Sequence, residues 1–373
     1  MAHAYTPGLR VTSFAVVRRE RRLPLKGEVL VSRGDRVTPG TVVARTDLPG
    51  NVQTVNLAAR LGIDPARVPE SLLLRVGSPV EKGAPVARAR SLFGLVTQSA
   101  EAPVSGTIES VSHVTGQLIL REPPLPVEVT AYVEGVVAEV IPEEGVVVEA
   151  RGSFLQGIFG VGGETSGPVA IAVDAPDREL TRECLSPEHR GAVVVGGASV
   201  SYETLTHARE LGVAAIVVAG FDDGDLRRLL GRDLGVAITG SEDLGLTLVL
   251  TEGFGRIPMA DRAWKLLREG SGRIASVSGA TQIRAGVLRP EVLIPRSDAG
   301  GGDEAGYGTA LDLGSMLRVI REPHFGRIGR VVELPAELMA LDSEARVRVL
   351  VVEFADDGAR ATIPRANVEL ISR

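Results

Sequence analysis

The sequence predicts a multidomain α/β plus all-β protein, with a β-rich first part, a central mostly parallel α/β part and a small β-rich end. Short Val- and Gly-rich runs with few helical signals fill residues 1–152. Strand and helix patterns then alternate through 168–295, and strand patterns return in 309–373. The 373 residues, 44% of them hydrophobic and 24% charged, are enough for several packed cores.

The composition excludes several classes of site. A single cysteine, Cys184, cannot make a disulfide framework, an iron–sulfur cluster or a zinc ribbon, and the five histidines show no metal-ligand spacing. A net charge of −6 argues against a generic polyphosphate binder. No nucleophile elbow, zinc-protease motif, phosphate loop or paired-carboxylate signature is present. We therefore predict no catalytic residue, no metal and no cofactor.

Targeting signals are also missing from the sequence. The first residues lack the apolar stretch and cleavage site of a signal peptide, and no window approaches the roughly 20 apolar residues of a membrane span. The expectation is a cytoplasmic protein without a membrane partner.

An internal repeat marks the first 152 residues. The pattern G-x-x-V-x-x-G-x-x-V-A occurs twice, with the same 43-residue offset at each position: Gly34, Val37, Gly40, Val43 and Ala44 recur as Gly77, Val80, Gly83, Val86 and Ala87. Each copy predicts a strand, a tight glycine turn and a return strand, and we expect the two copies to pack together. Between them, residues 56–74 predict a short helical excursion broken at Pro65.

Two stretches of this part, LPLKGEVLVSRGDRVTPGTVVA (23–44) and EAPVSGTIESVSHVTGQLI (101–119), resemble known modules. They are similar to the barrel-sandwich hybrid of biotinyl and lipoyl domains and to the N-terminal region of the C subunit of Rnf electron-transport complexes. The resemblance implies a barrel-sandwich hybrid fold. It does not extend to covalent biotin or lipoyl, because Lys26 and Lys82 lie in the glycine-turn strands and no methionine flanks them.

The central part, 168–295, reads as buried strands separated by helices. Strands are expected at 167–173, 191–197, 214–221, 235–240 and 247–255. Helices are expected at 201–212, 223–231 and 258–270, the first capped by Ser201 and stopped by Gly212. The alternation of strands and helices predicts an open, mostly parallel sheet. Residues 191–220 (GAVVVGGASVSYETLTHARELGVAAIVVAG) resemble the strand–helix–strand core of swivelling or protease-associated α/β domains.

Ligands of open α/β sheets bind beyond the carboxyl ends of the strands. Three loops at such ends carry the candidate anion-binding residues, which are Ser199, Ser201, Thr239, Ser241, Glu252 and Arg256. Hydroxyls and free backbone N–H groups at helix starts can hold an anion, and an arginine can add a charged fork. Serine and threonine are equally the preferred helix caps, and we favour capping at these positions.

The end of the chain follows a predicted flexible Gly/Asp linker at 296–308. Residues 321–371, with Gly326, Gly329, Val331 and Gly358, resemble the KOW module, which implies a small five-stranded β-barrel that contacts RNA, polymerase or other proteins. Candidate contact residues are Arg318, Arg321, His324, Arg327 and Arg330. Nine arginines and nine acidic residues cancel between positions 317 and 373, so protein contact is favoured over RNA.

These observations support one leading hypothesis and two alternatives. The leading hypothesis is a non-catalytic, multidomain binding or assembly protein that docks protein partners or copies of itself. The first alternative is a transcription- or translation-associated factor that contacts RNA or polymerase through the C-terminal module. The second is an enzyme or sensor that binds a small anionic ligand at the α/β loops.

Overall fold

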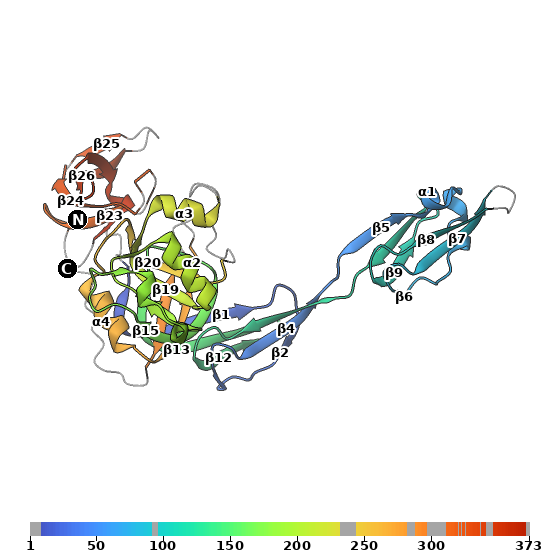
Figure 1. The fold of residues 1–373 in the computed structure, drawn as a ribbon, viewed down its shortest axis with the longest axis horizontal. Coiled ribbons are helices and arrows are strands. Elements are labelled where there is room, and N and C mark those ends of the chain that lie inside the picture. The colour runs from blue at the N-terminus through green and yellow to red at the C-terminus, as the bar shows by residue number, and fades with distance from the viewer. Residues whose placement is uncertain are drawn as a thin grey trace.

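The computed structural model describes residues 9–91, 96–231, 244–281, 288–296 and 311–370, the last range without 320, 322, 325, 336 and 341–345. The protein is strand-rich, with 47% strand and 15% helix. A long β-rich arm, formed by residues 23–144, extends from a head that contains the rest of the described chain (Figure 1). Within the described residues, no helix has the length and apolar character needed to cross a membrane.

The largest sheet of the described residues has 13 strands and runs from the head into the arm. Its path is β14-β20-β19-β17-β15-β21-β22-β13-β12-β3, with β1 on the other side of β13, β18 paired with β19, and β16 paired with β18. The bounds are β1 (Val11–Arg22), β3 (Arg36–Val37), β12 (Gly135–Ile141), β13 (Gly145–Gln156), β14 (Phe159–Val161), β15 (Glu164–Ile171), β16 (Glu179–Leu180), β17 (Val193–Val195), β18 (Ser199–Val200), β19 (Ala215–Phe221), β20 (Thr247–Phe254), β21 (Ile274–Ser278) and β22 (Glu291–Pro295).

The prediction of a mostly parallel sheet is wrong. Parallel pairing is confined to β15, β17, β19 and β20 and to the short strands β16 and β18. The remaining pairs of this sheet are antiparallel. They include β15 with β21, β21 with β22, β22 with β13, and β14 with β20. Two parallel strands must be joined by a crossover connection such as a helix. Strands β1 and β13 lie before the segment in which strands and helices alternate, so that pattern does not apply to them.

Helices cover both faces of the parallel strands. Alternate residues of β17 and β19 point to opposite faces, so that Val194 and Ile216 join one hydrophobic cluster and Val193 and Val217 join another. The first cluster packs under α2 (Tyr202–Leu211) and α3 (Asp223–Leu230), and the second packs under α4 (Asp261–Glu269). Short 3₁₀ turns complete the helical structure: η1 (Pro65–Arg67), η2 (Pro69–Ser71), η3 (Arg182–Cys184), η4 (Pro187–His189) and η5 (Arg365–Asn367).

The arm consists of two modules, one nested inside the other. The proximal module lies between β1 and β13 and uses β3, β12, β2 (Glu28–Val29), β4 (Val42–Leu48) and β11 (Leu125–Thr130). The distal module is inserted between β4 and β11. Its elements are β5 (Val52–Asn56), α1 (Leu57–Leu61), β6 (Pro79–Val80), β7 (Pro85–Ser91), β8 (Val96–Glu101), β9 (Gly106–Val111) and β10 (Gln117–Arg121).

The two copies of the 43-residue repeat do not pack together, contrary to expectation. Val37 and Val43 lie in the proximal core, whereas Val80 and Val86 lie in the distal core. Each copy buries its apolar face against a hairpin of its own module instead. The 43-residue spacing is therefore the signature of two similar modules rather than of two halves of one module.

Backbone hydrogen bonds show how closely the modules match. The Gly34 amide donates to the Val137 carbonyl at 2.8 Å in the proximal module, and the Gly77 amide donates to the Ile108 carbonyl at 2.7 Å in the distal module. Residues 131–137 (AYVEGVV) and 102–108 (APVSGTI) share the pattern A-x-V-x-G-x-[VI] and complete the respective copies. This second repeat, which the sequence analysis missed, identifies the partner hairpins.

The C-terminal residues form a six-stranded antiparallel sheet, the C-terminal sheet. Its strands are β23 (Met316–Val319), β24 (Ile328–Glu333), β25 (Leu338–Ala340), β26 (Arg346–Phe354), β27 (Arg360–Pro364) and β28 (Val368–Leu370). Leu317, Val331 and Leu350 belong to its own hydrophobic cluster. Except for Arg296, the predicted linker at 296–308 lies outside the described residues.

Candidate functional site

Two candidate residues from different predicted sites meet in one buried ion pair. An Arg318 Nη2 atom lies 2.7 Å from Glu252 Oε2, and the two side chains are 2% and 8% exposed. Glu252 Oε1 also accepts the Ala260 amide at 3.1 Å and the Thr251 hydroxyl at 3.3 Å. Glu252 is therefore held as a structural partner of Arg318, and neither group is open to a ligand.

Glycines bring the end of β20 against the C-terminal sheet at the same place. A Cβ on Gly253 would lie 2.4 Å from the Gly326 carbonyl oxygen, and a Cβ on Gly326 would lie 2.5 Å from the ring of Phe254. Gly326 has a φ of 82°, which also disfavours a side chain. The close approach buries the ion pair and fixes the C-terminal sheet on the head.

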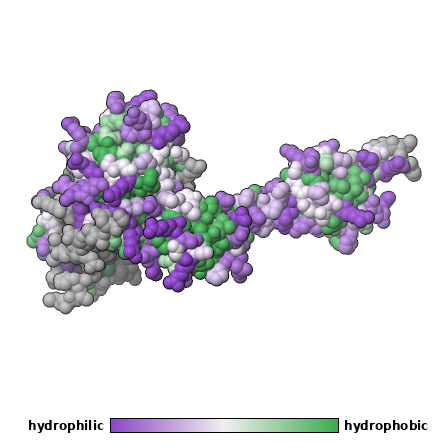
Figure 2. All heavy atoms as spheres, turned by 90° about the horizontal axis from the view of Figure 1, so that it is seen from below, coloured by the Kyte–Doolittle hydropathy of each residue, from purple (hydrophilic) through white to green (hydrophobic). Residues whose placement is uncertain are grey.

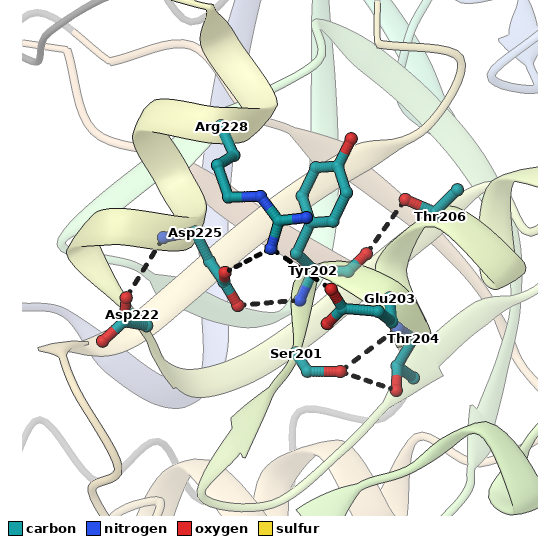
Figure 3. A network of polar contacts seen from close by, with 8 residues as sticks. All are labelled: Ser201, Tyr202, Glu203, Thr204, Thr206, Asp222, Asp225 and Arg228. Carbon is teal, nitrogen blue, oxygen red and sulfur yellow. Dashed lines mark hydrogen bonds and ion pairs between the residues drawn. The ribbon is translucent and has the colours of Figure 1, made fainter.

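Ser201 caps α2, as we had favoured. Its Oγ accepts the Thr204 amide at 3.2 Å, and Gly212 ends the helix in the left-handed conformation. Figure 3 shows the surrounding network, in which Asp225 accepts the Tyr202 amide at 2.9 Å and Arg228 bridges Asp225 and Glu203. These contacts join the starts of α2 and α3 and leave the Ser201 hydroxyl engaged within the protein.

Among the described residues, no hydrogen bond or ion pair joins the other loop candidates to Ser201, although the Ile257 amide donates to the Ala198 carbonyl at 3.4 Å and so brings the loop of Arg256 against that of Ser199. Ser199 lies in β18 and is half-buried, and Arg256 is exposed in the turn after β20. Thr239, Ser241 and the strand expected at 235–240 lie outside the described residues. The described loops therefore bring together helix caps and a buried ion pair rather than a set of free anion-binding groups.

The arginines of the C-terminal sheet are largely engaged within the protein. Arg327 pairs with Asp356 and with Asp357, and its guanidinium lies 3.7 Å from the centre of the Phe354 ring. His324 contacts the same ring, with a centroid distance of 5.1 Å. Arg330 is exposed on β24, and Arg321 is half-buried.

Cys184 and His189 have separate structural roles. The Cys184 Sγ lies 3.5 Å from the Thr181 hydroxyl, whereas His189 Nδ1 accepts the Ser186 amide at 3.0 Å and completes a capping box. The described residues contain no group of three potential metal ligands.

A polar joint connects the arm to the head. Tyr132, in the proximal module, is 4% exposed, and its hydroxyl donates to Glu291 Oε1 at 3.2 Å. Glu291 also pairs with Arg19 of β1, and Arg21 pairs with Glu164 at 2.7 Å. Burial, with the negative charge of Glu291, raises the pKa of the Tyr132 phenol well above its ordinary value. The joint is thus a neutral phenol bonded to a paired carboxylate.

An open groove of about 1170 Å³, which the sequence analysis missed, lies between the proximal module and the head. It is bordered by β3 and β12 of the proximal module and by β21 and β22 of the head. Six arginines line it: Arg18, Arg33, Arg36, Arg151, Arg273 and Arg296. They are spread from position 18 to position 296 and form no run in the sequence.

Comparison of the chain with protein-family models and with curated proteins gives no match. The arm, the joint and the groove are therefore the structural features that bear on function.

Proposed function

We propose that the chain is a non-catalytic binding or assembly protein whose arm presents the distal module to a protein partner or to a second copy. The observation that supports this proposal is the position of the distal module. Its hydrophobic core uses residues between 55 and 120, and a narrow stalk separates it from the rest of the molecule (Figure 2). A module held away from the head leaves most of its surface available for contact.

The distal module also offers apolar contact surface. Leu73, Val76 and Val114 are 46%, 54% and 73% exposed. Exposed apolar side chains are common singly, but three large ones on a small displaced module are suited to a protein interface.

The contacts described above weigh against the two alternatives. Of the small-ligand candidates, Ser201 caps a helix and Glu252 neutralises Arg318. Of the RNA-contact candidates, Arg318 is buried and Arg327 is paired with two aspartates. A protein-docking function explains why the distal module lies away from the head. It does not require the side chains that are already paired within the protein.

Excision of the distal module tests the proposal. Leu48 and Leu125 are paired neighbours in the β4–β11 ladder, so an Asn-Gly turn in place of residues 49–124 closes these strands into a hairpin. The full chain and the excised chain would be compared as baits in extract of the native cell and by sedimentation velocity. We expect partner capture or self-association to be lost on excision. Unchanged capture and association, or metabolite turnover by the full chain, would refute the proposal.

A further inference from the structure

The groove between the proximal module and the head is strongly basic in a chain that is acidic overall. Its lining contains six arginines and two glutamates, an excess of four positive charges, whereas the whole chain has a net charge of −6. Positive charge is thus concentrated at one place, and a basic cleft of this kind attracts anionic partners.

Part of this charge is not neutralised within the protein. Glu149 is shared by Arg18 at 3.1 Å and Arg151 at 3.2 Å, and these arginines lower the pKa of Glu149 below its ordinary value. One carboxylate thus serves two guanidinium groups. Arg33 and Arg36 are both exposed, and neither forms an ion pair with another described residue. Guanidinium groups in this state favour bidentate contacts with carboxylates or phosphates.

The lining distinguishes among anionic partners. Val136 and Ile274 are 40% and 43% exposed, and both lie in the groove. No aromatic side chain is among the lining residues, so the stacking surfaces that single-stranded nucleic acids use are missing from it. At about 1170 Å³, the groove is open and larger than most small-molecule pockets. Apolar and basic groups together suit a protein segment that carries both carboxylates and apolar side chains.

We propose that this arginine groove binds an acidic protein segment in which carboxylate side chains contact Arg33 and Arg36 and apolar side chains contact Val136 and Ile274. This proposal rests on the docking function proposed above and adds the chemical class of one partner. No groove residue lies within 49–124, so the groove and the distal module can be tested separately.

The test measures binding of a short fluorescein-labelled peptide of alternating glutamate and leucine by fluorescence anisotropy, with oligothymidylate of equal charge as the competing anion. The variant is R33E/R36E. The matched control is R88E/R90E, which reverses two exposed arginines of the distal module and gives the same net charge. We expect R33E/R36E to weaken peptide binding at least roughly tenfold, equivalent to about 1.4 kcal/mol, and the control to leave it within about twofold.

Binding should also weaken as salt is raised, because exposed charge pairs are screened. The excised chain, which lacks the distal module, should bind the peptide as the full chain does, even if excision abolishes partner capture. Equal weakening by the two double variants, tighter binding of oligothymidylate than of the peptide, or no peptide binding by the full chain would overturn the proposal.

Discussion

At the residue scale, the Glu252–Arg318 pair determines how the C-terminal sheet is attached to the head. Removing one partner of a buried pair leaves the other charge uncompensated, which costs about 3–5 kcal/mol. We expect Arg318→Ala to lower the free energy of unfolding by this amount in urea denaturation. The double substitution Glu252→Leu with Arg318→Met should cost less than Arg318→Ala, because no unpaired charge remains. A double variant that is less stable than R318A would contradict this account.

The raised pKa of the Tyr132 phenol predicts that the protein becomes less stable at alkaline pH. The folded pKa of its phenol is raised, so the stabilisation is fully present below the unfolded pKa of about 10 and is lost as pH rises through that value and toward the folded pKa. We expect the free energy of unfolding to fall above about pH 10 and to fall less steeply in Tyr132→Phe. The readout is urea denaturation at a series of pH values, with phenolate absorbance to follow ionisation. An identical slope in both proteins would contradict the prediction.

Residue roles were predictable where the contact is local. Ser201 and Gly212 were predicted as the cap and stop of α2 because their partners lie within a few residues. The Glu252–Arg318 pair joins positions 66 apart, and its members had been assigned to two different candidate sites. A charged residue beside a glycine turn has the same local sequence pattern whether its side chain faces solvent or a buried partner.

At the element scale, the start of α2 distinguishes capping from ligand binding. Loss of an N-cap hydroxyl costs about 1 kcal/mol, so Ser201→Ala should lower stability by about this amount in the absence of any ligand. Ser199→Ala, in the neighbouring half-buried strand, should change stability by less than about 0.5 kcal/mol. Thermal unfolding of both variants, with and without nucleotides and organic anions, provides the measurement. Equal effects of the two substitutions, or stabilisation by an anion that S201A abolishes, would favour a ligand site.

Elements were easier to predict than their pairing. Apolar periodicity placed α2, α3 and β19 within a residue or two, because each element's pattern is contained in its own sequence. The antiparallel half of the sheet was missed because β1 and β13 come from the β-rich first part of the chain and because no strand was predicted at β21 or β22. Periodicity reports which residues are buried but not which strand lies beside them.

At the scale of the whole molecule, the nested arm predicts independent folding. The core of the distal module contains residues 55–120 and none from the head, so its removal should leave the head unperturbed. We expect the excised chain to keep the thermal midpoint of the head to within a few degrees, and residues 50–123 to unfold cooperatively when expressed separately. Differential scanning calorimetry tests both. Loss of the head transition on excision would show that the modules depend on one another.

The nesting could have been anticipated only in part. The repeat at Gly34 and Gly77 indicated duplication, and the A-x-V-x-G-x-[VI] pattern at 102–108 and 131–137 would have paired each copy with its own hairpin. The arginine groove had no comparable signal, because its residues come from β1, β3, β12, β13, β21 and β22 and their adjoining turns. Such a surface exists only after the arm folds against the head.

The central claim, that the arm presents the distal module for docking, is tested most directly by competition. Proteins of native-cell extract would be bound to the immobilised full chain and challenged with excess residues 50–123, and the released proteins would be quantified by mass spectrometry. The account predicts selective release of a defined protein, or of soluble full chain where the chain self-associates. Retention of every bound protein under saturating competitor would contradict it.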